Sequence, residues 1–138
     1  MAYMPLETIV EIYRNAISAS GVGNADYQSG CVRRLEQLLQ NGGTGDIRFR
    51  EGFYWIIDSA SYTHPEGRLN SGRGKALLHL LAHIGEAVNS DELVRIAGWS
   101  PATESERSRL ARQVNNKSQQ FRIQYGKGIS YMMLERVT

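Results

Sequence analysis

The stretch ERSRLARQVNNKSQQFRIQYGKGISYMML, residues 106–134, begins with helical periodicity and ends with the pattern of a β-hairpin. When residues 103–121 are placed about 100° apart, Leu110, Val114 and Phe121 fall in one narrow apolar stripe. The segments FRIQY and ISYMMLERV then flank Gly126-Lys127-Gly128, a sequence suited to a tight turn. We therefore predict a helix at about 101–120, followed by two strands with their turn within 122–131.

The face of this helix opposite the stripe is polar and carries no carboxylate, because Glu104 and Glu106 fall on its flanks. Arg suits guanine edges, Asn and Gln suit adenine, and Ser contacts bases or phosphates. A merely solvated face usually mixes charges of both signs. We therefore expect this face to bind nucleic acid. The candidate residues are Ser105, Ser108, Arg109, Arg112, Asn115, Asn116 and Gln119 on the helix, Arg122 and Lys127 on the hairpin, and Arg73 and Lys75 near the start of an earlier helix.

The distribution of charge supports the same expectation. Residues 1–65 hold 5 Lys and Arg against 7 Asp and Glu, a net charge of −2, whereas residues 66–127 hold 10 against 6, a net charge of +4. Such asymmetry between the halves of a chain suggests a nucleic-acid surface on one side. Arg outnumbers Lys 13 to 3, and the planar Arg fork suits phosphates and guanine.

The remaining patterns predict the other elements. Apolar residues at helical spacing indicate two helices within residues 5–40, the first ended by Gly21 and the second by Asn41-Gly42-Gly43. Alternation and aromatic residues indicate a small antiparallel sheet over 46–69, with a turn at Glu51-Gly52. From Gly72 the helical period returns in GKALLHLLAHIGEAV, and NSDELVRIAGW follows as the next helix.

Three helices followed by a two-stranded hairpin is the element order of a winged helix-turn-helix. In that fold the third helix enters the major groove and the hairpin, or wing, contacts the DNA backbone. We therefore predict an α+β fold, with an N-terminal helical hairpin at 1–43 and a winged helix DNA-binding domain, preceded by its small sheet, at 44–138. The function expected is that of a sequence-specific double-stranded DNA-binding protein, a transcriptional regulator without enzymatic activity or cofactor.

Residues 53–134 resemble the OmpR-type winged-helix effector domain of bacterial response regulators. In that family a small sheet leads into an aspartate and a turn glycine, a leucine-rich helix follows, and the wing closes on a Gly-x-Gly-aromatic pattern. The matching residues here are Asp58, Gly67, Leu69, Leu77, Leu78, Leu81, Val88, Ser90, Glu92, Leu93 and Trp99, with YGKGISYMML as the wing. Departures are Gly74 and Lys75 where the family has Thr-x-x-Glu, and Ile129-Ser130 inserted in the wing. The resemblance implies a DNA-binding fold. It does not imply phosphorylation switching, because residues 1–45 are too short for a receiver domain and lack its βα pattern.

Two groups of residues in the sequence could form a metal site or a nuclease site. His79 and His83 have a spacing that can hold a metal, but nothing in the sequence ties a third ligand such as His64, Cys31 or Asp91 to them. We therefore expect an exposed or interfacial pair and no metal. The acids Asp46, Glu51 and Asp58 could serve a nuclease only as a cluster, whereas the predicted sheet uses them as scaffold.

Partners and compartment follow from the same patterns. The N-terminal helices either form a homodimer, which would pair two DNA half-sites, or pack on the chain's own sheet. A winged helix also serves as a protein-interaction or adaptor module, which is the alternative function. A single cysteine excludes an internal disulfide, and the first residues, with Glu7 and Glu11, lack a signal-peptide core. No apolar run reaches the roughly 18 residues of a membrane span, so we expect a soluble cytoplasmic protein.

Overall fold

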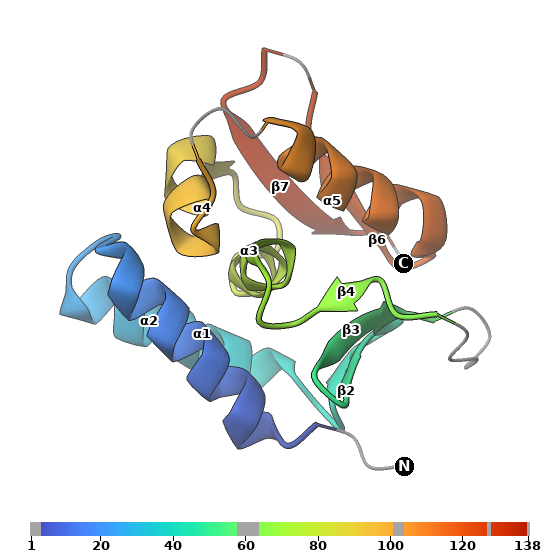
Figure 1. The fold of residues 1–138 in the computed structure, drawn as a ribbon, viewed down its shortest axis with the longest axis horizontal. Helices are drawn as coiled ribbons and strands as arrows, with labels where there is room; N and C mark the ends of the chain where they lie inside the picture. The colour runs from blue at the N-terminus through green and yellow to red at the C-terminus, as the bar shows by residue number, and fades with distance from the viewer. Residues whose placement is uncertain (1–3, 58–63, 101–103, 127, 138) are drawn as a thin grey trace.

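A computed structural model of the chain describes residues 4–57, 64–100, 104–126 and 128–137. Over these residues the fold is α+β, as predicted, with five helices and two small antiparallel sheets (Figure 1). The helices are α1 (Leu6–Ser20), α2 (Ala25–Leu38), α3 (Gly72–Leu81), α4 (Ser90–Ala97) and α5 (Glu104–Lys117). The strands are β1 (Gly43–Thr44), β2 (Ile47–Arg50), β3 (Phe53–Ile56), β4 (Gly67–Arg68), β5 (Val88–Asn89), β6 (Phe121–Gln124) and β7 (Tyr131–Arg136).

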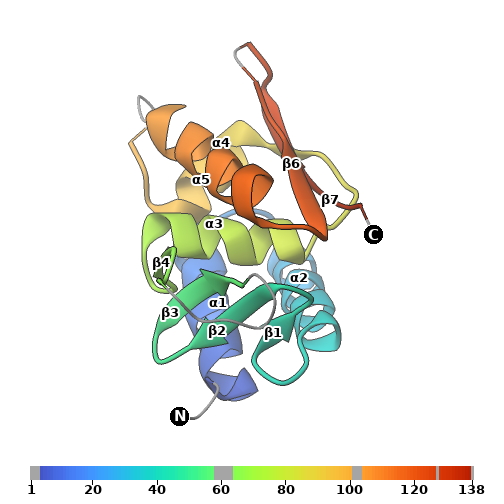
Figure 2. The ribbon, with the colours of Figure 1, turned by 90° about the vertical axis from the view of Figure 1, so that its right-hand side faces the viewer.

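Helix α3 is the central element of the molecule. Figure 2 shows it lying between α1, α2 and the first sheet on one side and α4, α5 and the β6–β7 hairpin on the other. Its Leu77, Leu78 and Leu80 are all fully buried. The Ser71 side chain caps its start by accepting a hydrogen bond of 3.1 Å from the Gly74 amide. A helix that is apolar on every side needs partners on every side, and both halves of the molecule provide them.

Helices α1 and α2 form the predicted N-terminal hairpin. Gly21, with φ of 68°, ends α1 in the left-handed conformation that glycine adopts without strain. The apolar sides of both helices, including Ile9, Ile17 and Leu35, are buried in the same core as α3 and α4. Of the two predicted uses of these apolar stripes, the structure shows packing within the chain. The stripes pack mainly on other helices and not on the sheet alone. No helix among the described residues is long and apolar enough to span a membrane.

The first sheet has the strand order β1-β2-β3-β4. Its β2–β3 hairpin pairs Phe49 with Tyr54, and its turn lies at Glu51-Gly52 as predicted. Both turn residues have positive φ, 53° and 85°, which matches the right-handed twist of a two-residue hairpin. The sequence pattern missed β1 because it has only two residues and no apolar alternation. The predicted boundary at 43/44 falls inside this strand.

The second sheet has the order β5-β7-β6 and carries the predicted C-terminal hairpin. Register pairs Ile123 with Leu134, and Phe121 and Ile123 point into the core. Strand β5, which pairs Val88 with Met132, was not predicted because its two residues precede a helix directly. It fixes the segment between α3 and α4 against β7.

One part of the sequence prediction is wrong. His79 and His83 were expected to form an exposed or interfacial pair on the face of α3 opposite its leucines. Both are buried, because α1 and α2 cover that face of α3. The contact is between helices of the same chain, so the pair is internal.

Asp46 links the first sheet to the end of α5. Its carboxylate accepts a 2.9 Å hydrogen bond from the Ser118 hydroxyl and a 2.8 Å hydrogen bond from the Gln119 amide. Ser118, which is buried, also accepts a 2.9 Å hydrogen bond from the Phe121 amide. The Asp46 carboxylate thus satisfies backbone and side-chain donors where the chain turns from α5 into β6.

We predict that Asp46→Ala lowers the free energy of unfolding by about 1.5–3 kcal/mol, because it leaves hydrogen-bond donors to a charged group without their acceptor. Urea unfolding followed by circular dichroism measures the change. Glu11→Ala removes only an exposed ion pair with Arg14 and should cost less than about 1 kcal/mol. Equal losses in the two variants would contradict the role given to Asp46.

Candidate nucleic-acid interface

Helix α5 divides into a buried and an exposed side, as its sequence predicts. Leu110, Ala111 and Val114 are buried, and Ser118 just past the helix end is buried beside them. On the opposite side Ser105, Arg109, Arg112, Asn116 and Gln119 are exposed, and Ser108 is half-buried. The polar face is therefore presented to solvent while the apolar stripe anchors the helix in the core.

A hollow of about 520 Å³ lies between α5 and the end of β6. We call it the α5–β6 groove; it is lined by Ser108, Ala111, Arg112, Asn115, Asn116, Tyr125 and Gly126. It brings four of the candidate residues together with the beginning of the turn between β6 and β7. One wall is the amide and guanidinium face of the helix, and the other is an aromatic ring beside a glycine.

Tyr125 is a lining residue to which the sequence analysis assigned no role. Its ring is half-buried, and the Arg107 guanidinium lies 6.0 Å from the ring centroid. The signal in the sequence was an aromatic residue directly before Gly126-Lys127-Gly128, at a turn expected to approach nucleic acid. An aromatic face next to a cation offers a stacking surface as well as charge.

Two candidate side chains are engaged with the backbone of their own chain. Asn115 donates a 2.9 Å hydrogen bond to the Ile123 carbonyl and accepts one of 2.7 Å from the Ile123 amide. Arg122 donates to the carbonyls of Ser118 and Phe121, at 2.6 and 2.9 Å. Asn115 therefore joins α5 to β6, and Arg122 closes the turn between them. Lys127 lies outside the described residues.

The two candidates at the start of α3 lie apart from this groove. Arg73 is half-buried, and its Nε is 3.4 Å from Glu106 of α5. Glu106 is also 3.7 Å from Arg109, so this flanking carboxylate is held between two guanidinium groups. Lys75 lines a separate hollow of about 380 Å³ together with Arg95 of α4 and residues of α1. Arg73 thus supports α5 from its flank, whereas Lys75 faces a different surface.

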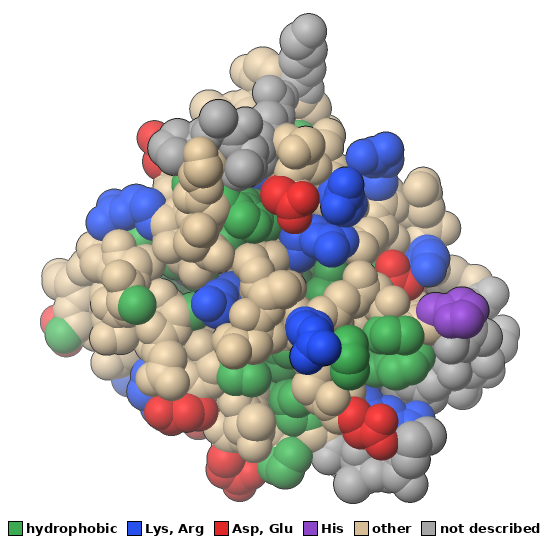
Figure 3. All heavy atoms as spheres, viewed as in Figure 1, with side chains coloured by type: hydrophobic (Ala, Val, Ile, Leu, Met, Phe, Trp, Pro, Cys, Tyr) green, Lys and Arg blue, Asp and Glu red, His purple; other side chains and the backbone are tan. Residues whose placement is uncertain are grey.

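Basic side chains gather on the side of the molecule that carries α5. Figure 3 shows several Lys and Arg side chains over the upper right of this view, where Figure 1 places α5, with fewer acidic ones among them. Lys117, at the end of α5, is paired with Glu66 at 2.6 Å. Among the described residues of α5, the groove itself receives no carboxylate. Its surface is therefore suited to an anionic partner.

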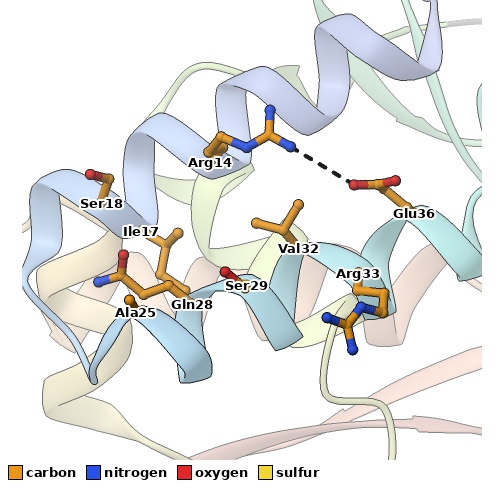
Figure 4. Close-up of a pocket in the computed structure, with 9 residues that line it drawn as sticks. All are labelled: Arg14, Ile17, Ser18, Ala25, Gln28, Ser29, Val32, Arg33 and Glu36. Atoms are coloured by element: carbon orange, nitrogen blue, oxygen red, sulfur yellow. Dashed lines mark ion pairs between the residues drawn. The ribbon is translucent and has the colours of Figure 1, made fainter.

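A second hollow, of about 410 Å³, lies between the outward faces of α1 and α2 (Figure 4). Ile17 and Val32 form its apolar part, and Arg14 and Glu36 face each other across it with a separation of 3.9 Å between Arg14 Nη2 and Glu36 Oε1. The hollow therefore combines exposed charges of both signs with a floor of buried apolar side chains.

The carboxylates considered for nuclease chemistry are not brought together by the described residues. Asp46 precedes β2 and Glu51 follows it, so a four-residue strand separates them by roughly 15 Å. Asp46 already accepts bonds from Ser118 and Gln119. Asp58 lies outside the described residues. The absence of enzymatic activity stays a prediction.

No family model, no curated protein and no solved structure matches this chain. A function is therefore inferred below from the residues of the α5–β6 groove and from the elements that position them.

We predict that Asn115→Ala and Asn116→Ala, adjacent substitutions of the same residue type, differ sharply in stability. Asn115→Ala leaves the Ile123 amide and carbonyl without their partners and should cost about 1–3 kcal/mol. Both side chains are exposed, but these two bonds to Ile123 belong to Asn115, so Asn116→Ala should change the free energy of unfolding by less than about 0.5 kcal/mol. Urea titration measures both values, and similar losses in the two variants would refute this division of roles.

Proposed function

We propose that the chain is a sequence-specific double-stranded DNA-binding protein of the winged helix-turn-helix class that acts as a transcriptional regulator. The observation that carries the proposal is the exposed polar face of α5, which opens onto a groove shared with the start of the β6–β7 turn and lined, among the described residues, by no carboxylate. The order α3, α4, α5, β6, β7 matches three helices and a wing. The resemblance of residues 53–134 to OmpR-type effector domains agrees with it.

In this proposal α5 is the recognition helix. Its 14 residues give a length of about 21 Å, and the major groove of B-DNA, about 12 Å wide, admits one α-helix. Arg112 and Asn116 would read base edges, since guanidinium groups suit guanine and amides suit adenine. Arg109 and Ser105 would contact base edges or phosphates at the N-terminal half of the helix.

The β6–β7 hairpin would serve as the wing. Gly128, with φ of 83°, lies in its turn, and Gly126 lines the groove, so the backbone there approaches a phosphate without obstruction by a side chain. Tyr125 would pack against a sugar or base at the edge of the site. Asn115 and Arg122 act indirectly, because their hydrogen bonds hold the hairpin at a fixed angle to α5.

A homodimer would pair two such helices on neighbouring half-sites and so raise affinity and specificity. The apolar stripes of α1 and α2 already face α3 inside the chain. A dimer contact through these helices would therefore use their outward faces, where Figure 4 shows a hollow lined by polar and charged side chains such as Arg14, Gln28 and Glu36 above the buried Ile17 and Val32. We also propose a cytoplasmic location, because the single Cys31 fits a reducing compartment.

The same outward hollow favours a second candidate function, that of an adaptor that binds another protein. Ser29→Arg would obstruct the hollow without touching the buried stripes, since Ser29 is exposed. Co-purification of a stoichiometric partner by the unmodified chain, lost in Ser29→Arg, together with no duplex binding at low salt, would favour the adaptor.

We predict that duplexes selected from a random pool will bind the chain and that Arg112→Ala will weaken binding by about 1–3 kcal/mol, with relaxed preference at one base pair. Fluorescence anisotropy with the selected duplex measures the affinity at several salt concentrations. Affinity should fall steeply as salt rises, because basic side chains displace counterions from the phosphates.

The matched control is Arg50→Ala, which removes the same charge from β2 and lines neither the α5–β6 groove nor the hollow between α1 and α2. It should leave the affinity for the selected duplex almost unchanged. If both Arg variants weakened binding equally, net charge rather than α5 would explain it. If Arg112→Ala had no effect, α5 would not be the recognition helix.

A further inference from the structure

Three residues with metal-binding side chains meet in the interior, away from the α5–β6 groove. Cys31 comes from α2, His79 from α3, and His83 from the turn that follows α3. Their exposed fractions are 2%, 0% and 7%. One ligand atom from each lies within 4.8 Å of the others. The sequence left Cys31, His64 and Asp91 open as a third ligand for the two histidines, and the fold brings Cys31 to them.

These side chains form two close pairs, one between Cys31 and His83 and one between His79 and Glu92. Cys31 Sγ lies 3.2 Å from His83 Nε2. His79 Nε2 lies 2.5 Å from Glu92 Oε2, on the first turn of α4. The Tyr27 hydroxyl lies between the two pairs, 2.7 Å from Glu92 Oε2 and 3.5 Å from His83 Nε2. One sulfur and two imidazole nitrogens therefore lie together between α2 and the end of α3, and the Glu92 carboxylate of α4 joins this group through its contact with His79.

The outward nitrogens of both rings have partners of their own. His79 Nδ1 lies 2.6 Å from the Tyr13 hydroxyl. His83 Nδ1 lies 3.3 Å from Glu86 Oε2 and 3.3 Å from Arg34 Nη1, and Arg34 donates to Glu86 Oε2 at 2.7 Å. Metal-bound histidines typically use their second nitrogen in this way, because such a contact fixes the ring and its tautomer. Both Nε2 atoms are thus directed to the inside of the cluster.

Metal binding requires a thiolate and a free imidazole lone pair. A bound divalent cation replaces the proton of the Cys31 thiol, which leaves to solvent as the metal–sulfur bond forms.

We propose that Cys31, His79, His83 and Glu92 bind one Zn²⁺ ion in a closed, structural site. Zinc accepts this mixture of sulfur, nitrogen and oxygen ligands in tetrahedral geometry. Ligand bonds of about 2.0–2.3 Å place neighbouring ligand atoms roughly 3.3–3.6 Å apart. The separation of Cys31 and His83 is close to this, and the ligand atoms of Cys31, His79 and His83 all lie within 4.8 Å of one another. Binding would draw these three atoms together and separate His79 from Glu92, so that the carboxylate becomes the fourth ligand.

The site ties together the two halves of the molecule. Cys31 belongs to the N-terminal hairpin, whereas His79 and Glu92 belong to α3 and α4, on which α5 is built. Zinc would therefore stabilise the fold by linking helices that are distant in the sequence. This inference is independent of DNA binding, because none of the four ligands lines the α5–β6 groove.

The test is titration of the full-length chain, stripped of metal under reducing conditions, with Co²⁺ and then Zn²⁺. One Co²⁺ per chain should bind and give the visible bands of a tetrahedral site with a near-ultraviolet thiolate-to-cobalt charge-transfer absorption. Zn²⁺ should displace it and raise the thermal unfolding temperature. Cys31→Ser should abolish the charge-transfer band. Absence of that band from the wild-type chain at saturating Co²⁺ would overturn the proposal.

Two further variants separate a metal site from a buried polar network. Glu86→Gln alters the outer partner of His83 and removes an exposed ion pair with Arg34, but it changes no proposed ligand, and it should weaken Co²⁺ binding by about 10- to 100-fold. His64→Asn, at an exposed histidine outside the cluster, should leave binding unchanged. If Cys31→Ser fails to fold, the wild-type spectrum and the Glu86→Gln affinity decide the question. Loss of binding in His64→Asn, or full binding in Glu86→Gln, would count against this site.

Discussion

The structure depends on the burial of α3 on every side. Helix α3 lies between the sheet and the hairpin of α1 and α2 on one side and α4 and α5 on the other, and its leucines are fully buried there. Helix α1 also packs directly on α4, so the two layers share one core. Each fully buried leucine contributes about 1.5–3 kcal/mol relative to an exposed one. Both layers are stabilised by burying the same α3 side chains. The core that orients α5 therefore includes the N-terminal helices.

Hydrophobic periodicity was sufficient to predict most of the elements. The stripes of α1, α2 and α5, and the alternation of β2 and β3, are long enough for the two periods to be distinguished. Strands β1 and β5 have two residues each, too few to show a period, and they exist because neighbouring strands offer them hydrogen bonds. The burial of His79 was not predictable for a related reason. A sequence pattern predicts that a polar residue on a helix is exposed, because it does not show which other elements will cover that residue.

The candidate site shows a similar limit. A helical wheel placed Arg112, Asn115 and Asn116 on one face, and the structure places all three along one groove. The wheel has no information about the strand that follows the helix, so it could not show that Asn115 bonds to Ile123 while its neighbour Asn116 stays exposed. The sequence pattern predicted only a charge for DNA at Arg122. It could not show that this guanidinium donates to the Ser118 and Phe121 carbonyls, because residue types carry no information about nearby backbone groups. Tyr125 gained significance only from its position beside α5.

The contact between Tyr13 and His79 joins residues 66 positions apart, which has a consequence for synthesis. Ribosomes add about 5–20 residues per second, so several seconds separate the emergence of α1 and α2 from that of α3. During this interval α1 and α2 can pack on each other but lack the cover that α3 and α4 give them in the folded chain. Apolar surface left exposed in this way favours aggregation and binding by chaperones. A gene fragment that ends before α3 would retain this exposed surface permanently.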